Sequence, residues 1–331
     1  MSDKIIELDS SVISCANTVG KKEFEGPLGK LFDFHSTDDR FNMDTWESAE
    51  GEMQNIALNI ALKRASLEYG DIGALFAGDL LNQCVGSAYG LLGCNIPYFG
   101  LYGACSTCAE GMMLASILTT HKVFDRCAAV TSSHNCSAER QYRTPIEYGG
   151  QRTPTSQWTV TGAGAFIIGN SDAGKVKISA AMPGRVIDKG INDANNMGAA
   201  MVGAVCDTLL RFFSESGSRP EDYDLIISGD LGHEGAQILR ELMSIESYTL
   251  GENYTDCGIL IYDKERQDTH AGGSGCGCSA AVMSAYVVPA IRKKIIKNAI
   301  FIGSGAMMSP DMIKQGKSIP AIGHLLVLEN K

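Results

Sequence analysis

The chain has 331 residues, of which 44% are hydrophobic and 20% are charged, and its formal net charge is −10. This length and composition suit one large globular domain or two smaller ones, and the acidic balance argues against non-specific nucleic-acid binding and a polybasic membrane patch. Eleven cysteines, an odd number scattered through apolar segments, favour a reducing compartment over a disulfide framework. We expect no signal peptide and no transmembrane segment, because the first residues lack a basic head and no apolar run approaches roughly 18 residues.

Helical and strand-like patterns alternate in the first half of the chain. Apolar residues recur at helical spacing in some segments, whereas short apolar runs bounded by glycine and polar residues indicate strands. The expected elements are a strand at Val12–Val19, a helix at Trp46–Tyr69, a strand at Gly73–Ala77, a helix ending near Leu92, a helix at Cys108–Thr120, a strand at Arg126–Ser133, a polar loop at His134–Pro154 and a strand at Val160–Gly169.

The second half repeats this plan, which indicates an internal duplication. Its elements are a helix at Met197–Ser216, a strand at Asp222–Ser228, a glycine-cysteine turn at Gly272–Cys278, a helix at Ser279–Ile291 and strands at Lys297–Ser304 and Ile322–Glu329. Strands that are apolar on both faces predict parallel sheets covered by helices. We therefore expect two α/β halves, residues 1–175 and 176–331, with a site between them at the carboxyl ends of the strands.

The turn Gly103–Thr107 (Gly-Ala-Cys-Ser-Thr) is the first candidate site. Its small residues allow a tight turn, and the helical pattern that follows places Cys105 at a helix N-terminus. Such a position lowers a thiol pKa and also attracts anions. The alternative is that Cys105 is a small buried residue that only caps the helix.

A reactive thiolate would need a base, and the chain has six histidines: His35, His121, His134, His233, His270 and His324. His121 ends the helix after Cys105 and should point away from it, and His35 lies in a polar segment. His324 opens the last strand, where it is either a core residue or a side chain that reaches the site.

Two cysteine and glycine patterns are weaker candidates. Cys105 and Cys108 have CxxC spacing, but Cys276 and Cys278 in the other half are one residue apart, which argues against a zinc or redox pair. The run Gly272–Gly277 fits neither the P-loop nor the full dinucleotide motif, so we interpret it as a place of close backbone packing.

The polar loop after Ser133 is a second candidate site. It carries one histidine and three arginines: His134, Arg140, Arg143 and Arg152. Arginine binds carboxylates through paired hydrogen bonds, so the loop suits a carboxylate ligand. The alternative, which we weigh evenly, is that Arg140 and Arg143 pair with Glu139 and Glu147 on a solvated loop.

Taken together, these segments resemble the thiolase and ketoacyl-synthase-III-like superfamily, and within it the stage V sporulation protein AD family of spore-forming bacteria. The resemblance extends from about Asn17 to Glu329. The motifs that carry it are Gly26–Gly29, Ala77–Gln83, Gly103–Thr107, Thr131–Asn135, Ala138–Gln141, Glu147–Gln151, Gly184–Asp188 and Ala271–Cys276.

The resemblance implies a thiolase-like α/β fold, with two duplicated halves packed as αβαβα layers. It also implies a protein that binds dipicolinic acid, alone or with calcium, for movement into the developing spore and release in germination. Its partners would be other stage V sporulation A membrane proteins, with the protein peripheral at the inner membrane of the forespore and spore. The resemblance implies no cofactor, no protein metal site and no nucleic acid, and leaves open whether two copies form a homodimer.

The sequence departs from the condensing enzymes of the superfamily at two expected positions. Those enzymes pair the cysteine with two histidines, or with a histidine and an asparagine, in the second half. The first position falls at Gly229 and Asp230, and the second falls at Ser274 and Gly275. The loss of both partners would remove the base and the oxyanion donors, so we expect a binding protein with a degenerate active site.

The residues expected to bind the ligand are Cys105, Ser106, Ser133, His134, Asn135, Arg140, Arg143, Asp230 and Ser274. The alternative function is a cysteine-dependent acyltransferase or condensing enzyme, with Cys105 as nucleophile and His233 or His270 as a displaced base.

Overall fold

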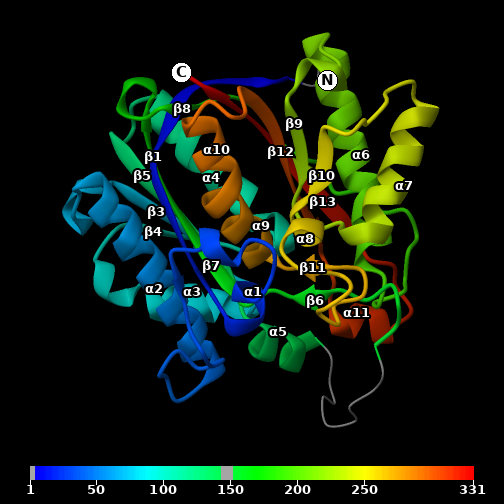
Figure 1. The fold of residues 1–331 in the computed structure, drawn as a ribbon, viewed down its shortest axis with the longest axis horizontal. Coiled ribbons are helices and arrows are strands. Elements are labelled where there is room, and N and C mark those ends of the chain that lie inside the picture. Colours follow the sequence, from blue (N-terminus) through cyan, green and yellow to red (C-terminus); the bar gives the residue numbers. More distant parts are fainter. Residues whose placement is uncertain (1–3, 143–151) are drawn as a thin grey trace.

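The computed structural model describes residues 4–142 and 152–331 (Figure 1). Its first half contains β1 (Ile6–Val19), α1 (Lys21–Phe24), β2 (Phe34–His35), α2 (Trp46–Ala65), β3 (Ala74–Gly78), α3 (Val85–Gly90), β4 (Tyr98–Leu101), α4 (Thr107–Thr120), β5 (Arg126–Ser133), α5 (Asn135–Tyr142), β6 (Trp158–Thr159) and β7 (Gly162–Asn170). The predicted polar loop therefore begins as a helix, α5.

The second half contains β8 (Val176–Met182), α6 (Met197–Ser216), β9 (Leu225–Ser228), α7 (Gly232–Ile245), β10 (Tyr254–Asp256), α8 (Cys257–Leu260), β11 (Gly273–Ser274), α9 (Cys276–Val282), α10 (Val288–Arg292), β12 (Asn298–Ala306), α11 (Pro310–Lys314) and β13 (Ala321–Asn330). A π-helical turn at Met283–Val287 joins α9 to α10, so the predicted helix at Ser279–Ile291 is one continuous rod with a local irregularity.

The strand order shows the duplication directly. In the described residues the main sheet runs β10-β9-β12-β13-β8-β1-β7-β5-β3-β4, with β2 paired to β1. Counted outward from the β8–β1 junction, the two halves have the same strand order. The strands β1, β7, β5, β3 and β4 correspond in turn to β8, β13, β12, β9 and β10.

The prediction of parallel sheets is wrong for part of each half. The pairs β1–β7, β5–β7, β8–β13 and β12–β13 are antiparallel, whereas β3 and β9 lie parallel to their neighbours. The prediction rested on strands that are apolar on both faces. Helices do bury both faces here, but burial does not fix strand direction, since mixed sheets are also covered on both sides.

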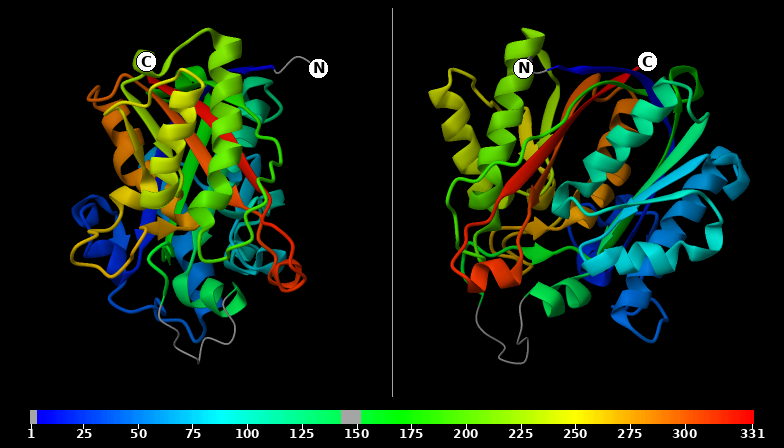
Figure 2. Two further views of the ribbon diagram at one scale, coloured as in Figure 1. Left: turned by 90° about the vertical axis from the view of Figure 1, so that its right-hand side faces the viewer. Right: turned by 180° about the vertical axis from the view of Figure 1, so that it is seen from behind.

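Helices form three layers around the two halves of the sheet (Figures 1 and 2). Helices α2 and α3 cover the outer face of the first half, α6 and α7 cover the outer face of the second, and α4 lies between the halves with α9 and α10. This is the expected αβαβα arrangement of a thiolase-like fold, which is confirmed.

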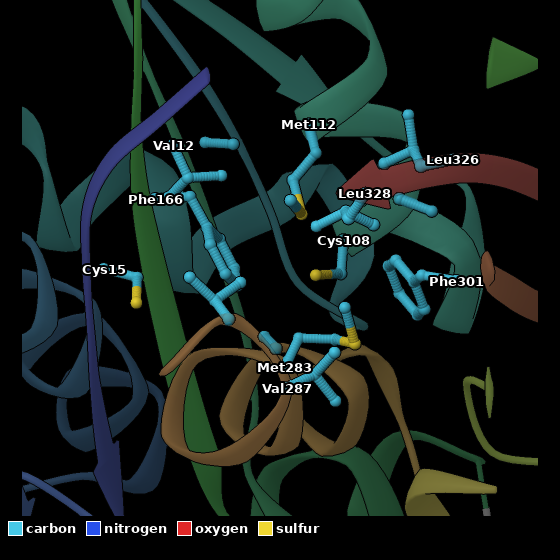
Figure 3. Close-up of a cluster of buried hydrophobic side chains, with 14 of the residues drawn as sticks. Val12, Cys15, Cys108, Met112, Phe166, Met283, Val287, Phe301, Leu326 and Leu328 are labelled. Atoms are coloured by element: carbon cyan, nitrogen blue, oxygen red, sulfur yellow. The ribbon is translucent and has the colours of Figure 1, made fainter. Parts of the chain in front are cut away.

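The central layer is a shared core rather than part of one half. In Figure 3, Met112 of α4 and Met283 of the π-helical turn lie between Phe166 of β7 and Phe301 of β12. Glycines permit this close packing: a Cβ added to Gly164 of β7 would lie 2.4 Å from the carbonyl oxygen of Ala280 in α9. The two halves therefore share one interior.

Capping residues explain where the long helices begin and end. The Asn196 side chain accepts a hydrogen bond from Ala199 N at 3.1 Å, and Gly217 ends α6 with a φ of 70°, so α6 matches its predicted range. Helix α2 ends earlier than predicted because Ser66 adopts the left-handed conformation.

Helix α6 is long and apolar enough to cross a membrane by length and composition alone. However, 67% of its most apolar window is buried inside the protein, and it packs against β12 and β13. This burial is typical of a core helix.

Candidate functional site

A cavity of about 610 Å³ opens where the two halves meet. This volume lies within the roughly 300–1,000 Å³ of small-molecule sites. Most of its walls come from the segment after β3, the turn before α4, helix α5, and the loop between β12 and α11. The lining residues include Leu80, Asn82, Tyr102, Cys105, Glu139, Gln141, Tyr142, Gln157, Thr159, Asn195, Ser274, Met307, Asp311 and Lys314.

Cys105 lies in the floor of this cavity, in a 3₁₀ turn that leads into α4. The preceding residue, Ala104, has a φ of 52°, a backbone conformation that non-glycine residues rarely adopt. The Cys105 side chain is 9% exposed and packs in a small cluster with Leu80, Ala138 and Cys276. The thiol thus faces the cavity.

Asp230 is the immediate neighbour of Cys105 from the second half, where it follows β9. It is buried, and its carboxylate accepts hydrogen bonds from Gly275 N at 2.8 Å, Ser304 Oγ at 2.8 Å and Ser274 Oγ at 3.1 Å. Gly275 has a φ of 102°, a conformation that favours glycine. The structure thus brings Cys105, Asp230 and Ser274 together, as expected from the sequence.

The expectation of a lowered thiol pKa at this helix N-terminus is wrong. Burial, the negative charge of Asp230 and a hydrogen bond to Asp230 raise the pKa of Cys105 well above its usual value. Burial also raises the pKa of Asp230, although the hydrogen bonds from Cys105 and Gly275 oppose that shift. Desolvation and a neighbouring carboxyl group outweigh the helix N-terminus here.

Uncharged polar side chains dominate the rest of the wall. Tyr142 Oη donates to Leu80 O at 2.6 Å and lies 3.1 Å from Tyr102 Oη, which is also 3.2 Å from Asn82 Oδ1. Gln157 Nε2 donates to the backbone oxygens of Asp230 at 2.8 Å and of Gly273 at 2.7 Å. These contacts hold the loop and α5 around the cavity.

Two of the arginines predicted to bind a carboxylate, Arg140 and Arg152, do not line this cavity. Arg140 pairs with Glu47 and lies over the Trp46 ring at 5.3 Å. Arg152 pairs with Asp268 at 3.1 Å. Arg143 lies outside the described residues. The expected partner Glu139 instead lines the cavity, where it accepts from Thr159 Oγ1 at 3.0 Å.

Four other predicted binding residues face backbone groups rather than the cavity. The contacts are Ser106 Oγ to Gly103 O at 2.7 Å, Ser133 Oγ to Val160 O at 2.6 Å, His134 Nε2 with Asp39 O at 2.6 Å and Asn135 Nδ2 to Thr159 O at 3.2 Å. None of the four lines the cavity in the described part of the chain. Ser133, His134 and Asn135 support its walls because they tie β5 and α5 to neighbouring segments, and Ser106 closes the turn before α4.

No histidine of the described residues lines the cavity. His270 contacts Asp268 at 2.9 Å and Thr153 O at 2.7 Å, and His233 is half-buried at the start of α7. His324 accepts a hydrogen bond from Gly184 N at 3.2 Å, and burial lowers its pKa to about 4. His121 is exposed at the end of α4.

Most of the lining residues were not expected from the sequence, and Tyr102, Gln157 and Lys314 are among them. Tyr102 ends the apolar run before the cysteine turn, a position that marked it for the core. Lys314 stands in a polar segment with no recognisable pattern. Among the described residues it is the one lysine or arginine that lines the cavity.

Metal chemistry has no evident site in the described ranges. No group of three or more His, Cys, Asp or Glu side chains there is placed to hold a metal ion, and all eleven cysteines are free thiols.

Comparisons with known proteins fit this architecture. A family model described as stage V sporulation protein AD matches residues 3–329. Stage V sporulation protein AD of Bacillus subtilis (strain 168) is 41% identical over 318 residues, which cover 96% of this chain and 94% of the relative.

Among solved structures, 3-oxoacyl-[acyl-carrier-protein] synthase III from Aquifex aeolicus VF5 has a TM-score of 0.56 and 13% identity, over 97% of this chain and 99% of that chain. Cerulenin-bound OleA from Xanthomonas campestris has a TM-score of 0.63 and 12% identity, over 99% of each chain. At such identities the likeness shows the fold alone.

Proposed function

Because the chain belongs to the stage V sporulation protein AD family and so has a role in sporulation, we propose that it binds dipicolinic acid without catalysing a reaction. The ligand is taken either free or as its calcium chelate. Binding serves its movement into the developing spore and its release in germination. The protein acts at the spore inner membrane with other stage V sporulation A proteins.

The observation that carries the proposal is the Cys105–Asp230 pair. Acyl transfer needs a thiolate, a base and donors for an oxyanion. Here a carboxyl group stands beside the thiol, raises its pKa and turns its own acceptor oxygens toward Ser274, Gly275 and Ser304. A carboxylate in this place would repel a developing oxyanion, so the cavity is suited to binding rather than to acyl chemistry.

The remaining lining suits a small aromatic acid. Tyr102 and Tyr142 supply aromatic surface and hydroxyl groups, and Asn82 and Gln141 supply amides. Lys314 at the edge supplies a positive charge for a carboxylate, as a point charge rather than as a fork.

Two carboxylates in the cavity lining, Glu139 and Asp311, oppose a free dianion. A calcium chelate, in which the metal neutralises the ligand, avoids that repulsion. This balance of charges is why both forms of the ligand stay in the proposal.

The proposal is tested by the shift in thermal stability that dipicolinate causes, measured with and without calcium. Acetyl-coenzyme A is the comparison ligand, because an acyl-transferring enzyme would bind it. A ligand that binds only the folded state stabilises it by about 2.7 kcal/mol at 100 times its dissociation constant. We expect Lys314→Ala to weaken dipicolinate binding about tenfold and Lys317→Ala, which removes a nearby exposed lysine outside the cavity, to leave it unchanged. Absence of any shift with dipicolinate on folded protein would refute the proposal.

A second candidate function is acyl transfer through Cys105, which is favoured by the position of this thiol in the cavity floor and by the fold shared with ketoacyl synthases. It predicts an acyl adduct on Cys105, seen by mass spectrometry, that passes to a second substrate. Such turnover would favour acyl transfer over ligand binding as the function of this cavity.

A further inference from the structure

Two carboxyl groups are buried side by side behind the cavity wall. Glu50 of α2 and Asp79, which follows β3, are both fully buried. A Cβ on Gly86 would lie 3.3 Å from both Asp79 Oδ2 and Glu50 Cδ, so the two groups face the same glycine. In residues 4–142 and 152–331, neither carboxyl group forms an ion pair. Two buried carboxylates without a cation do not both stay ionised.

The hydrogen bonds indicate which of the two holds the proton. Asp79 accepts from two backbone N–H groups at 2.7 and 2.8 Å and from the Ser87 hydroxyl at 2.6 Å. Among the described residues, Glu50 meets only hydroxyl groups, those of Ser132 at 3.0 Å and Ser137 at 2.9 Å. A backbone N–H can only donate, whereas a hydroxyl can also accept, so the surroundings of Asp79 favour a carboxylate and those of Glu50 tolerate an acid.

A leftover acceptor in the same cluster supports this assignment. Gln54, one turn along α2 from Glu50, donates through Nε2 to Ser132 Oγ at 2.7 Å, Ser87 Oγ at 2.9 Å and Gly78 O at 3.2 Å. Its Oε1 is buried and has no donor in the part of the chain that the structure describes. A proton on Glu50 adds a donor to a cluster that has one acceptor too many. Burial, followed by the charge of Asp79, raises the pKa of Glu50 well above its usual value.

The pair is connected to the cavity through two segments. Ser137, which Glu50 holds, is on α5, the helix whose Gln141 and Tyr142 line the cavity. Asp79 fixes the turn that presents Leu80 O to Tyr142 Oη at 2.6 Å and to Gln141 Nε2 at 3.2 Å. The same two side chains therefore depend on both carboxyl groups.

We propose that Glu50 is a positioning residue for the ligand cavity, and that it acts as a buried acid whose proton lets it lie beside the Asp79 carboxylate and hold α5 in place. The ligand part of this inference rests on the proposed function. When the proton leaves to solvent, two negative charges face each other in the core, and α5 loses its fixed position.

Other titratable groups near the pair do not replace this proton in the neutral range. Glu47 on α2 is paired with Arg140. The remaining neighbours are two thiols and a phenol: Cys84, whose pKa is raised to about 11 by burial, Tyr98, whose pKa is raised to about 12 by burial, and Cys276, whose pKa is raised well above its usual value by burial. All three therefore stay uncharged in the neutral range.

The sign of the pH effect follows from the raised pKa of Glu50. A carboxyl group that binds its proton more tightly in the folded state stabilises the protein at low pH and loses that contribution as pH rises through the folded-state pKa. Other buried carboxyl groups, such as Asp256, whose pKa is raised to about 7 by burial, add to the same trend. Thermal stability without ligand should therefore fall as pH rises above neutral in the parent, and Glu50→Gln should reduce this fall. Glu52→Gln, on the same helix but outside the pair, should keep it.

Calorimetry with dipicolinate across the neutral and alkaline range tests the link to the cavity. We expect parent affinity to fall by up to about tenfold per pH unit once the proton is lost, and Glu50→Gln to bind with a clearly flatter profile. Glu50→Ala, which cannot hold Ser137, should bind dipicolinate more weakly at every pH. Glu50→Gln should therefore retain affinity that Glu50→Ala loses.

An unchanged pH slope in Glu50→Gln, or a flat profile in the parent, would overturn the inference. If dipicolinate does not bind at all, the proposed function fails, and the ligand-free stability profile still decides whether Glu50 holds a proton. If Glu50→Gln does not fold, Asp79→Asn serves, because removing that charge should move the pH dependence to lower pH.

Discussion

Replacing Asp230 by asparagine should make the thiol of Cys105 more reactive toward alkylating reagents. The substitution keeps the shape of the side chain and removes the negative charge beside Cys105. An asparagine oxygen can still accept from Gly275 N, and its amide group can donate to Ser304 Oγ, since a hydroxyl both donates and accepts. The cavity should therefore keep its form.

The size of the effect follows from the charge that is removed. Two unit charges about 4 Å apart interact by about 4 kcal/mol at an effective dielectric constant near 20, so removing the charge of Asp230 favours the thiolate. Intrinsic thiolate reactivity falls with pKa, with a Brønsted coefficient near 0.5, so the net gain in rate is about thirtyfold. Burial of Cys105 remains, so its pKa should fall without reaching that of an exposed thiol.

The assay is the rate of alkylation by iodoacetamide at mildly alkaline pH, read for the Cys105 peptide alone by mass spectrometry. Peptide resolution matters because Cys136, which is partly exposed, gives background. Ser274→Ala is the matched control: its hydroxyl lowers the pKa of Cys105, so its loss should slow alkylation. An unchanged Cys105 rate in folded Asp230→Asn would show that the charge of Asp230 does not control this thiol.

Three further outcomes follow from the same structure. Cys105→Ala should weaken dipicolinate binding only modestly by calorimetry, whereas Cys105→Leu should block the cavity, and normal binding by the leucine variant would place the ligand elsewhere. Gly164→Ala should destabilise the protein by about 1–3 kcal/mol in urea unfolding, because the added Cβ would lie 2.4 Å from Ala280 O. Gly93→Ala should not destabilise it, because no described atom lies within 4 Å of a Cβ at that position. Equal stabilities of the two variants would contradict the packing described. Stability should fall as pH drops from about 6.5 toward about 4, because the buried His324 must then gain a charge that its lowered pKa resists. His324→Gln should flatten this part of the pH profile. A variant as pH-sensitive as the parent would exclude His324 as the cause.

Chain order predicted the centre of the site but not its wall. Cys105, Asp230 and Ser274 each follow or begin a regular element, so the duplicated plan places them at the junction of the halves. Arg140 was misjudged because its partner Glu47 is 93 residues away, and a local reading considers only neighbouring acids. Glu50 carried an overlooked signal, since it is a charged residue on the buried face of α2.

The fold shows the same division between local and long-range information. Strand β5 and helix α6 have their predicted bounds, because apolar patterning and caps set them locally. Strand direction depends on how the chain returns, which periodicity does not encode. The repeated Gly-Asp-Leu turns after β3 and β9 are equivalent in position, yet Asp79 faces Glu50 whereas Asp230 faces Cys105.

The shared interior affects how the chain folds as it is synthesised. Helix α4 is complete after residue 120, but its packing partners Phe301, Leu326 and Leu328 leave the ribosome last. Until then the inner apolar face of the first half is open to water, and such a surface is prone to aggregation. Such a nascent chain needs either fast completion or a chaperone that covers α4. A premature stop after the first half would leave an aggregation-prone fragment rather than an independently folded domain.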